Sequence, residues 1–359
     1  MARIQLQNVS KTFGHHAALG GIDLDVADGQ FFVLLGPTGA GKTTTLRLIA
    51  GLEKPTAGAI RIDGDDVATQ GPAERDVALV LQQYSLYPRY TVRQNLEFPL
   101  KSKLRREAPD EIARRVARAA KTLRIEHLLD RKVDRLSGGE MQRVSIGRAI
   151  VRKPRVFLMD EPLSALDAKL RESLRTELKD LQRALNATFV FVTHDQIEAM
   201  SMADKVGVLH RGRLVQTGSP QEIYNNPRDT FVASFVGSPP MNLLEGRLVG
   251  GRAVIAPQSF ELPYEGAANG GTDARPLTFG IRPEDIQLVS GGAIEARVHD
   301  VENHGVEKIL TLRVGDQMLR ATVPARTEVS IEDAVRFAWN PAKVRLFDRS
   351  SGVSLAHAG

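Results

Sequence analysis

The sequence lacks cysteine, contains a single tryptophan, and has no long apolar run. Without cysteine the chain forms no disulfide, thiolate nucleophile or cysteine metal site, so these kinds of stabilisation and chemistry are excluded. No apolar stretch approaches the roughly 20 residues that a membrane-spanning helix needs. The first residues, Met1 to Leu6, also lack the apolar core of a signal peptide. Any role at a membrane is therefore expected to depend on a partner protein.

The remaining composition is that of a globular protein with room for two domains. The chain has 359 residues, of which 42% are hydrophobic and 25% are charged, and this length can bury two separate cores. The net charge of +5 is unevenly distributed: residues 1–240 contain 35 Lys and Arg against 28 Asp and Glu, whereas residues 241–359 contain 13 against 15. The basic first part suits contacts with phosphates or with a membrane-side partner, but solubilising surface charge is the better explanation for most individual residues.

A glycine-rich stretch, residues 36–43, dominates the first part. Its sequence fits the pattern G-x-x-x-x-G-K-[ST] of phosphate-binding loops and reads Gly36-Pro37-Thr38-Gly39-Ala40-Gly41-Lys42-Thr43. Residues 31–35 precede it as an expected buried strand, and residues 43–50 follow as an expected helix. Backbone N–H groups of such a loop surround phosphate oxygens, while Lys42 would contact the outer phosphates and Thr43 a Mg²⁺ ion. An ordinary glycine-rich turn is the alternative; the flanking strand and helix favour nucleotide binding.

Three further apolar runs are expected to be buried strands that end in polar side chains. These ends are Gln82 and Gln83 after residues 77–81, Asp160 and Glu161 after residues 156–159, and Thr193, His194 and Asp195 after residues 188–192. In a sheet that carries a phosphate-binding loop, such side chains lie near the nucleotide. Asp160 would hold Mg²⁺ and Glu161 would polarise the attacking water. Solvated turn residues are the alternative.

The sequence says less about the roles of the two glutamines and of His194. Spacing alone does not separate Gln82 from Gln83 as the residue that touches Mg²⁺ or the water. A lone histidine is usually structural, but the position of His194 at a strand end favours a contact with the γ-phosphate. No other histidine has such a context, so we expect no zinc site.

The stretch Leu136-Ser137-Gly138-Gly139-Glu140 has two interpretations. In the first, Ser137 caps a helix and Glu140, three residues later, reaches back to complete a capping box. In the second, the serine hydroxyl, the two glycines and the exposed helix start form another phosphate site. Spacing alone does not decide between them.

Taken together, these motifs resemble those of the ATP-binding subunit of ABC transporters over about residues 1–235. Residues 36–43 match the Walker A motif, residues 136–140 the LSGGQ signature and residues 156–161 Walker B. Residues 164–167 match the D-loop, Gln82 falls at the Q-loop glutamine, and Phe13 falls where an aromatic ring stacks on adenine. The resemblance implies the catalytic residues Glu161, His194, Gln82 and Lys42, and the Mg²⁺ ligands Thr43, Gln82 and Asp160. It implies ATP contacts at Phe13, Gly36, Pro37, Thr38, Gly39, Ala40, Gly41, Lys42, Thr43, Thr44, Ser137, Gly138, Gly139 and Asp167.

A narrower resemblance, to the maltose-type carbohydrate importer subfamily, spans nearly the whole chain. It is carried by residues 72–75, 84–88, 193–200, 235–242 and 280–285. It implies a homodimer with ATP between the two copies, two transmembrane permease subunits docked near residues 84–89, and, indirectly, a solute-binding protein. The location implied is peripheral, on the cytoplasmic face of a bacterial inner membrane. The cargo that the subfamily resemblance favours is a sugar, a polyol or glycerol 3-phosphate.

Two residues depart from the family pattern. Glu140 stands where the signature has glutamine, and because a carboxylate would be repelled by the γ-phosphate, we expect it to point back toward the helix cap. Phe13 replaces tyrosine or tryptophan, which should weaken adenine stacking only modestly because the π face remains.

The fold class expected is an α/β P-loop ABC ATPase domain, residues 1–235, with a helical subdomain at about residues 88–155, followed by an all-β domain, residues 236–359. Short alternating segments separated by turn residues predict one or two OB-like barrels and are residues 244–255, 277–281, 293–298, 309–314, 318–323 and 343–347. This part is acidic and poor in aromatic residues, which argues against nucleic-acid binding. The subfamily resemblance implies dimerisation and regulation instead. Residues 350–359 are expected to form a loose tail.

Three rival functions stay open at this point. An ABC ATPase outside transport would need coiled-coil insertions or a second cassette, and neither is present in the sequence. An importer ATPase for an oxyanion, iron or a polyamine is compatible with the sequence, because other subunits choose the cargo. A P-loop kinase or GTPase would leave residues 137–140 without a use.

Overall fold

The computed structural model describes residues 2–102, 106–249, 252–255, 260–263, 276–292 and 294–356. The chain divides into two compact units, residues 1–220 and 221–359. The predicted domain boundary lies at residue 235 instead. The residues between the two positions form α7 (Pro220–Asn225) and α8 (Thr230–Phe235). Ala233 of α8 packs with Met241 and Phe347 of the second unit.

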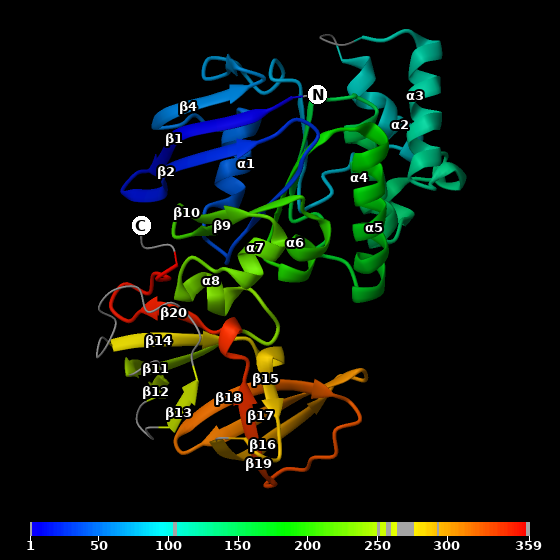
Figure 1. The fold of residues 1–359 in the computed structure, drawn as a ribbon. Coiled ribbons are helices and arrows are strands. Elements are labelled where there is room, and N and C mark those ends of the chain that lie inside the picture. The colour runs from blue at the N-terminus through cyan, green and yellow to red at the C-terminus, as the bar shows by residue number, and fades with distance from the viewer. Residues whose placement is uncertain are drawn as a thin grey trace. The chain divides into compact units, whose positions relative to one another are not determined.

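Two sheets build the first unit (Figure 1). A six-stranded sheet has the order β10-β9-β3-β8-β7-β6 and is parallel except for β10, and a four-stranded antiparallel sheet has the order β2-β1-β4-β5. The strands are β1 (Ile4–Phe13), β2 (His16–Val26), β3 (Phe31–Leu35), β4 (Ala57–Ile62), β5 (Asp65–Asp66), β6 (Val77–Val80), β7 (Val156–Asp160), β8 (Thr188–Thr193), β9 (Lys205–His210) and β10 (Arg213–Gly218). Helix α1 (Lys42–Ala50) contacts strands of both sheets.

The central strands β3, β7 and β8 are buried along their whole length. Parallel strands covered on both faces read as continuous apolar runs, which is how the sequence identified them. One core joins the side chains of α1 to those of both sheets, including Leu34, Leu158 and Val190. The carboxyl ends of these strands are thereby held rigidly beside the start of α1.

The helical part predicted for residues 88–155 is present (Figure 1). It contains α2 (Val92–Glu97), α3 (Pro109–Thr122) and α4 (Gly138–Ile150), with the short helices η1 (Phe98–Lys101), η2 (Glu126–Leu128) and η3 (Val133–Arg135). Two more helices, α5 (Ala168–Leu185) and α6 (Gln196–Met202), follow strands β7 and β8. In the described part of the chain, no helix has the length and apolar character to cross a bilayer.

The second unit contains two five-stranded antiparallel sheets with the orders β13-β12-β11-β14-β20 and β15-β19-β16-β17-β18. The strands are β11 (Asn242–Val249), β12 (Arg252–Ile255), β13 (Phe260–Pro263), β14 (Pro276–Ile281), β15 (Ile286–Leu288), β16 (Ile294–Asn303), β17 (Glu307–Val314), β18 (Gln317–Pro324), β19 (Ala334–Trp339) and β20 (Arg345–Asp348). Short helices η4 (Pro283–Asp285) and η5 (Pro341–Lys343) interrupt them. Their inward side chains, such as Phe279, Leu310 and Phe337, share one core. The prediction of an all-β region is confirmed.

Several details of that prediction were wrong. The segment 244–255 is two strands, β11 and β12, and strands β13, β15 and β19 were not expected. The tail is held by bridges from Val353 to Asp229 and from Ser354 to Phe347, and Ser354 is buried. Residues 250, 251, 293 and 357–359, on which parts of these predictions fall, lie outside the described residues.

Candidate nucleotide-binding site

The loop of residues 36–43 joins β3 to α1 and leaves no room for side chains at two of its glycines. At Gly36 an added Cβ would lie 2.3 Å from the carbonyl oxygen of Leu209. Gly41 has φ +106°, and its Cβ would lie 2.8 Å from the carbonyl oxygen of Ala18. Glycine is therefore required at both positions, one for close approach and the other for close approach and a left-handed backbone. The loop is pressed against its neighbours and keeps its backbone available at the start of the helix.

Lys42 is the first residue of α1 and is only 5% exposed. Its ammonium nitrogen donates to the carbonyl oxygens of Gly36 at 2.9 Å and Pro37 at 3.1 Å. It also lies 3.4 Å from a carboxylate oxygen of Glu161. The cation is thus fixed over the loop that the sequence assigns to phosphate. Thr38 and Gly39 at the loop tip are exposed, while Ala40 is buried.

Strand register brings the other predicted side chains to the same edge. Leu35 of β3 pairs with Thr193 of β8, and Asp160 of β7 pairs with Val192 of β8. Since these strands are parallel, the residues that follow them emerge together beside the start of α1. The prediction that Lys42, Glu161 and His194 meet at one site agrees with the geometry.

Asp160 and Thr43 form an oxygen pair at this edge. The Thr43 hydroxyl donates to Oδ1 of Asp160 at 2.9 Å, and Asp160 is 8% exposed. Burial raises the pKa of the Asp160 carboxyl, and its hydrogen bond with Thr43 only partly opposes this. Two adjacent hard oxygens, one of them from a poorly solvated carboxylate, fit a small divalent cation such as Mg²⁺.

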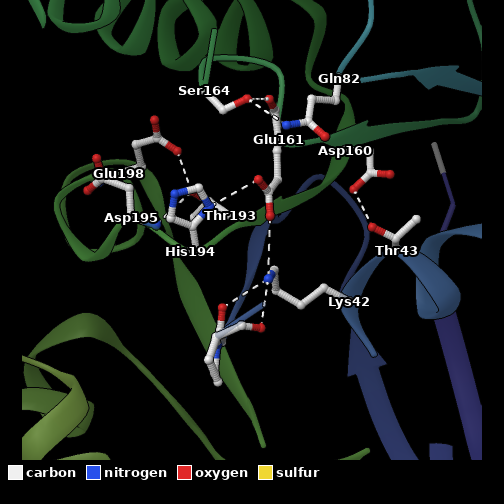
Figure 2. A network of polar contacts seen from close by, with 12 residues as sticks. Lys42, Thr43, Gln82, Asp160, Glu161, Ser164, Thr193, His194, Asp195 and Glu198 are labelled. Carbon is white, nitrogen blue, oxygen red and sulfur yellow. Dashed lines mark hydrogen bonds and ion pairs between the residues drawn. The ribbon is translucent and has the colours of Figure 1, made fainter. Parts of the chain in front are cut away.

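Glu161 turns away from Asp160 because its backbone is left-handed, with φ +44°. This backbone conformation is costly for a residue other than glycine. The hydrogen bond from the Glu161 N–H to the carbonyl oxygen of Val192 helps to stabilise it. Figure 2 shows the Glu161 carboxylate between Lys42 and His194. His194 Nδ1 lies 3.0 Å from Oε2 of Glu161. The two neighbouring carboxylates therefore point in different directions, Asp160 toward Thr43 and Glu161 toward Lys42 and His194, as expected from the sequence.

The structure distinguishes the two glutamines after β6. Gln82 donates through Nε2 to the Ser164 hydroxyl at 3.3 Å, and that hydroxyl donates to the carbonyl oxygen of Glu161 (Figure 2). Both glutamines are exposed, but the contact at Gln83 is made by its backbone carbonyl, which accepts from the hydroxyl of Ser85. Gln82 is thus the glutamine that faces the site.

A buried network behind His194 was missed by sequence reasoning. The N–H of Asp195 donates to the Thr193 hydroxyl at 3.0 Å, and that hydroxyl donates to Oε2 of Glu198 at 2.5 Å. Glu198 is 2% exposed, and burial raises the pKa of its carboxyl. Asp195 also caps α6, and Arg171 of α5 contacts its carboxylate. The network fixes the backbone on both sides of His194 (Figure 2). In the sequence, this network is contained in residues 193–200, which the sequence analysis used only as evidence for the family resemblance.

Two predicted ATP contacts lie outside this cluster. The Phe13 ring, at the end of β1, is 45% exposed, with the ammonium group of Lys11 4.6 Å from its centroid. Asp167 is exposed and caps α5 through the N–H of Leu170 at 2.9 Å. In the described part of the chain, neither residue contacts the Lys42 cluster, so their contacts with ATP stay predictions.

The stretch at residues 136–140 forms the capping box. The Ser137 hydroxyl accepts from the N–H of Glu140, and Glu140 Oε2 accepts from the N–H of Ser137 at 2.7 Å. The expectation that Glu140 points back toward the cap is confirmed. Ser137 is exposed, whereas Gly139 is buried and its Cβ would lie 2.2 Å from Leu170. Capping does not exclude the second interpretation, because the helix start remains open at Ser137.

Arg75, in the marker stretch 72–75, has a structural role that the sequence did not reveal. It is 3% exposed and donates to the carbonyl oxygens of Leu48 at 2.6 Å and Ile49 at 3.0 Å. It thereby caps the C-terminal end of α1, whose N-terminal end faces the phosphate loop.

A groove of about 500 Å³ lies beside the segment after Gln82. Aromatic rings of Tyr84, Tyr87 and Phe98 line it together with Arg148 of α4. Arg148 lies over the Tyr87 ring at 4.7 Å. Tyr84 reaches the start of α4, where its hydroxyl would be 3.2 Å from a Cβ at Gly138. The groove therefore touches both the residue 82–87 segment and the helix that begins at the 137–140 cap.

Comparison with known proteins identifies the family. Models described as "ABC transporter", "MalK OB fold domain" and "TOBE domain" match residues 19–164, 237–286 and 279–347. The chain is 45% identical to the trehalose/maltose import ATP-binding protein MalK of Thermococcus litoralis, over 99% of this chain and 100% of that protein. The chain belongs to the ABC transporter family. It is 48% identical to the sn-glycerol-3-phosphate import ATP-binding protein UgpC of Rhizobium meliloti, over 97% of this chain and 98% of that protein.

Solved structures agree with this assignment. A dimeric bacterial ABC transporter cassette superposes with a TM-score of 0.55 at 34% identity, covering 60% of this chain and 98% of that chain. A post-hydrolysis state of an ATP-binding cassette, bound to ADP and Pi, gives 0.54 at 33% identity, with the same coverage. This ABC ATPase therefore binds and hydrolyses ATP, and its second unit carries the OB and TOBE domains of the family. The predictions of family, fold class and enzyme activity are confirmed.

Proposed function

We propose that this ABC ATPase powers an importer whose cargo is a sugar, a polyol or glycerol 3-phosphate. The observation that carries the proposal is the convergence of Lys42, Glu161 and His194 at one sheet edge in a chain related throughout its length to import ATP-binding proteins. The relatives named above import trehalose or maltose, and glycerol 3-phosphate. No observation favours an oxyanion, iron or a polyamine.

In the proposed reaction, Glu161 acts as the base that orients and deprotonates the attacking water. Its Oε2 faces His194, which positions the γ-phosphate, and Lys42 neutralises charge that develops on the phosphates. Gln82 approaches the same place through Ser164 and holds the water or the metal. The phosphates lie on the backbone of residues 36–41 and on the hydroxyls of Thr43 and Thr44.

Mg²⁺ would be held by Thr43 and Asp160, with Gln82 as a further oxygen ligand. When bound, the ion neutralises and orients the β- and γ-phosphates. The buried Asp160 carboxylate gains a partner of opposite charge in that complex.

Two copies of the chain are proposed to pair head to tail, each supplying Ser137, Gly138 and Gly139 to the nucleotide on its partner. One chain has one phosphate loop and one such helix start, so two copies make two composite sites. Phe13 stacks on adenine, and Asp167 contacts the nucleotide site of the partner. ATP binding closes the dimer and hydrolysis opens it.

The groove beside Tyr84 and Tyr87 is the proposed docking site for each of two permease subunits. Its aromatic lining suits a partner with apolar side chains. The ATPase would then be a peripheral protein on the cytoplasmic face of the inner membrane, coupled through the permease to a solute-binding protein. Closure of the dimer would be linked to permease conformation by differential binding.

A closure experiment tests the proposal. The Glu161→Gln protein, given ATP and Mg²⁺, should bring the nucleotide-binding units of two copies together, seen as a more compact particle in small-angle X-ray scattering, and keep its nucleotide bound. ADP should leave these units apart, whether or not the second units hold the two copies together. Adding Ser137→Ala to this variant should weaken closure, because the γ-phosphate loses a donor. A Glu161→Gln protein that scatters identically in saturating Mg²⁺-ATP and in ADP would contradict the composite site. Co-purification of the permease, followed by identification of its ligand, tests the cargo.

A further inference from the structure

The Glu140 carboxylate engages both polar groups of Ser137. Glu140 Oε2 accepts from the Ser137 N–H at 2.7 Å and from the Ser137 hydroxyl at 2.8 Å. The Ser137 oxygen in turn accepts from the N–H of Glu140 at 3.4 Å. A serine hydroxyl has only one proton to donate. In this arrangement that proton is directed at a carboxylate of the same chain.

Glu140 is an anion at neutral pH. The hydrogen bonds from the Ser137 N–H and hydroxyl lower the pKa of its carboxyl, and the nearby guanidinium of Arg131 acts in the same direction. The side chain is half-buried, and Ser137 beside it is exposed. A negative charge is therefore held at the surface of the helix start that faces a nucleotide in the proposed dimer.

We propose that Glu140 is a positioning residue whose negative charge raises the ATP concentration needed to close the dimer. The inference rests on the proposed function, because it places Ser137 against the triphosphate of the partner copy. The charge repels the incoming phosphate, and the carboxylate competes with it for the Ser137 proton. The chain therefore needs more ATP than one with a neutral side chain at this position.

Glutamine separates charge from capping. Its Oε1 occupies the place of the carboxylate oxygen and accepts from the same Ser137 groups, so the helix cap is retained. Only the negative charge is lost. Aspartate keeps the negative charge but weakens the helix cap, because its shorter side chain does not reach Ser137 as well.

The experiment measures the ATP concentration at half-maximal ATPase rate in the full-length protein. For Glu140→Gln it should fall by about two- to fivefold, as expected for removal of one half-buried like charge near the surface, with a smaller change in kcat. Raising KCl from about 0.05 M to about 1 M should narrow the difference from the wild type, because salt screens surface charges. Glu140→Asp should keep the high ATP requirement. Glu328→Gln, which removes an exposed charge from the second unit, should have less than a twofold effect.

Each outcome decides the inference. An ATP requirement of Glu140→Gln that equals or exceeds that of the wild type overturns it, as does a fall of the same size for Glu140→Asp. A difference that does not respond to salt also overturns it. Failure of the proposed function has another signature: the nucleotide-binding units of the Glu161→Gln protein would then fail to close on Mg²⁺-ATP whatever side chain stands at position 140.

Discussion

Two buried cationic side chains, Lys42 in the first unit and Arg282 in the second, have different kinds of partner. In the first unit, buried Lys42 and Asp160 lie at one sheet edge, where Lys42 contacts another charged side chain, Glu161. In the second unit, buried Arg282 is engaged by backbone carbonyls, those of Tyr224, Ala233 and Val236, and it stacks on the Tyr224 ring at 3.9 Å.

The difference in partners indicates a difference in role, catalysis for Lys42 and structural support for Arg282. A buried charge that faces another titratable group changes its interactions when a ligand or proton arrives. A buried charge bound to backbone carbonyls has no such freedom and joins segments of the chain. The described ion pairs at the surface of the second unit, such as Arg336 with Glu295, are exposed and contribute little. We therefore expect changes at the Lys42–Glu161 cluster of the first unit to alter turnover, and changes at the contacts that join segments of the second unit to alter stability.

The largest effect expected is that of Glu161→Gln. Loss of the base should lower the ATPase rate about 100-fold or more, while ATP still binds because Lys42 and the loop are intact. Phosphate release measures the loss of turnover, and nucleotide binding on the same preparation measures whether ATP still binds. A variant that keeps a tenth or more of the wild-type rate would show that Glu161 is not the base.

Lys42→Ala should act on binding as well as turnover. Removing a buried cation over the phosphate loop should weaken ATP binding by about tenfold or more, as for a lost charge-assisted hydrogen bond. Titration with a fluorescent ATP analogue measures it. Lys54→Ala, on an exposed residue of the same unit, is the matched control. Equal affinities for the two variants would remove Lys42 from the site.

In the second unit, Asn242→Ala should destabilise without slowing turnover. The Asn242 amide donates to the carbonyl oxygens of Ile281 and Arg320 and accepts from the N–H of Arg320, which ties β11 of one sheet to β18 of the other. Its loss should reduce the free energy of unfolding by about 1–3 kcal/mol. Denaturant unfolding measures this, and the ATPase rate should stay within twofold. A large loss of turnover at unchanged stability would break the division between the units.

The smallest effect expected is a pH dependence at Glu198. Burial raises the pKa of this carboxyl in the folded state, so its contribution to stability is complete below the unfolded pKa of about 4.3 and is lost as pH rises through the folded value. The wild type should therefore lose stability relative to Glu198→Gln between pH 4 and pH 8. Urea unfolding of both proteins across this range measures the trend, with Glu172→Gln as an exposed control. A constant difference would contradict it.

Much of the fold of the first unit was predictable because fully buried parallel strands leave continuous apolar runs. The polar residues that end those runs predicted the site for the same reason. The second unit was predicted less well. Strand β15 has only three residues, and β13 and β19 carry no clear alternation that separates them from turns.

What the sequence could not show is which side chains are tied to the backbone. In the sequence analysis, Arg75 and Glu198 served only as parts of the marker stretches 72–75 and 193–200. In the structure Arg75 caps α1, and Glu198 is buried against Thr193. Gln82 and Gln83 differ only in the direction that each takes after β6. These roles depend on contacts between segments far apart in the chain.

The central claim is that ATP is held between two copies of the chain. A structure of the Glu161→Gln protein with Mg²⁺-ATP tests it most directly. The account predicts that Ser137 and the N–H of Gly139 from one copy lie within hydrogen-bonding distance of the γ-phosphate bound at Lys42 of the other. A single chain that encloses the whole triphosphate, with Ser137 turned away from any nucleotide, would contradict it.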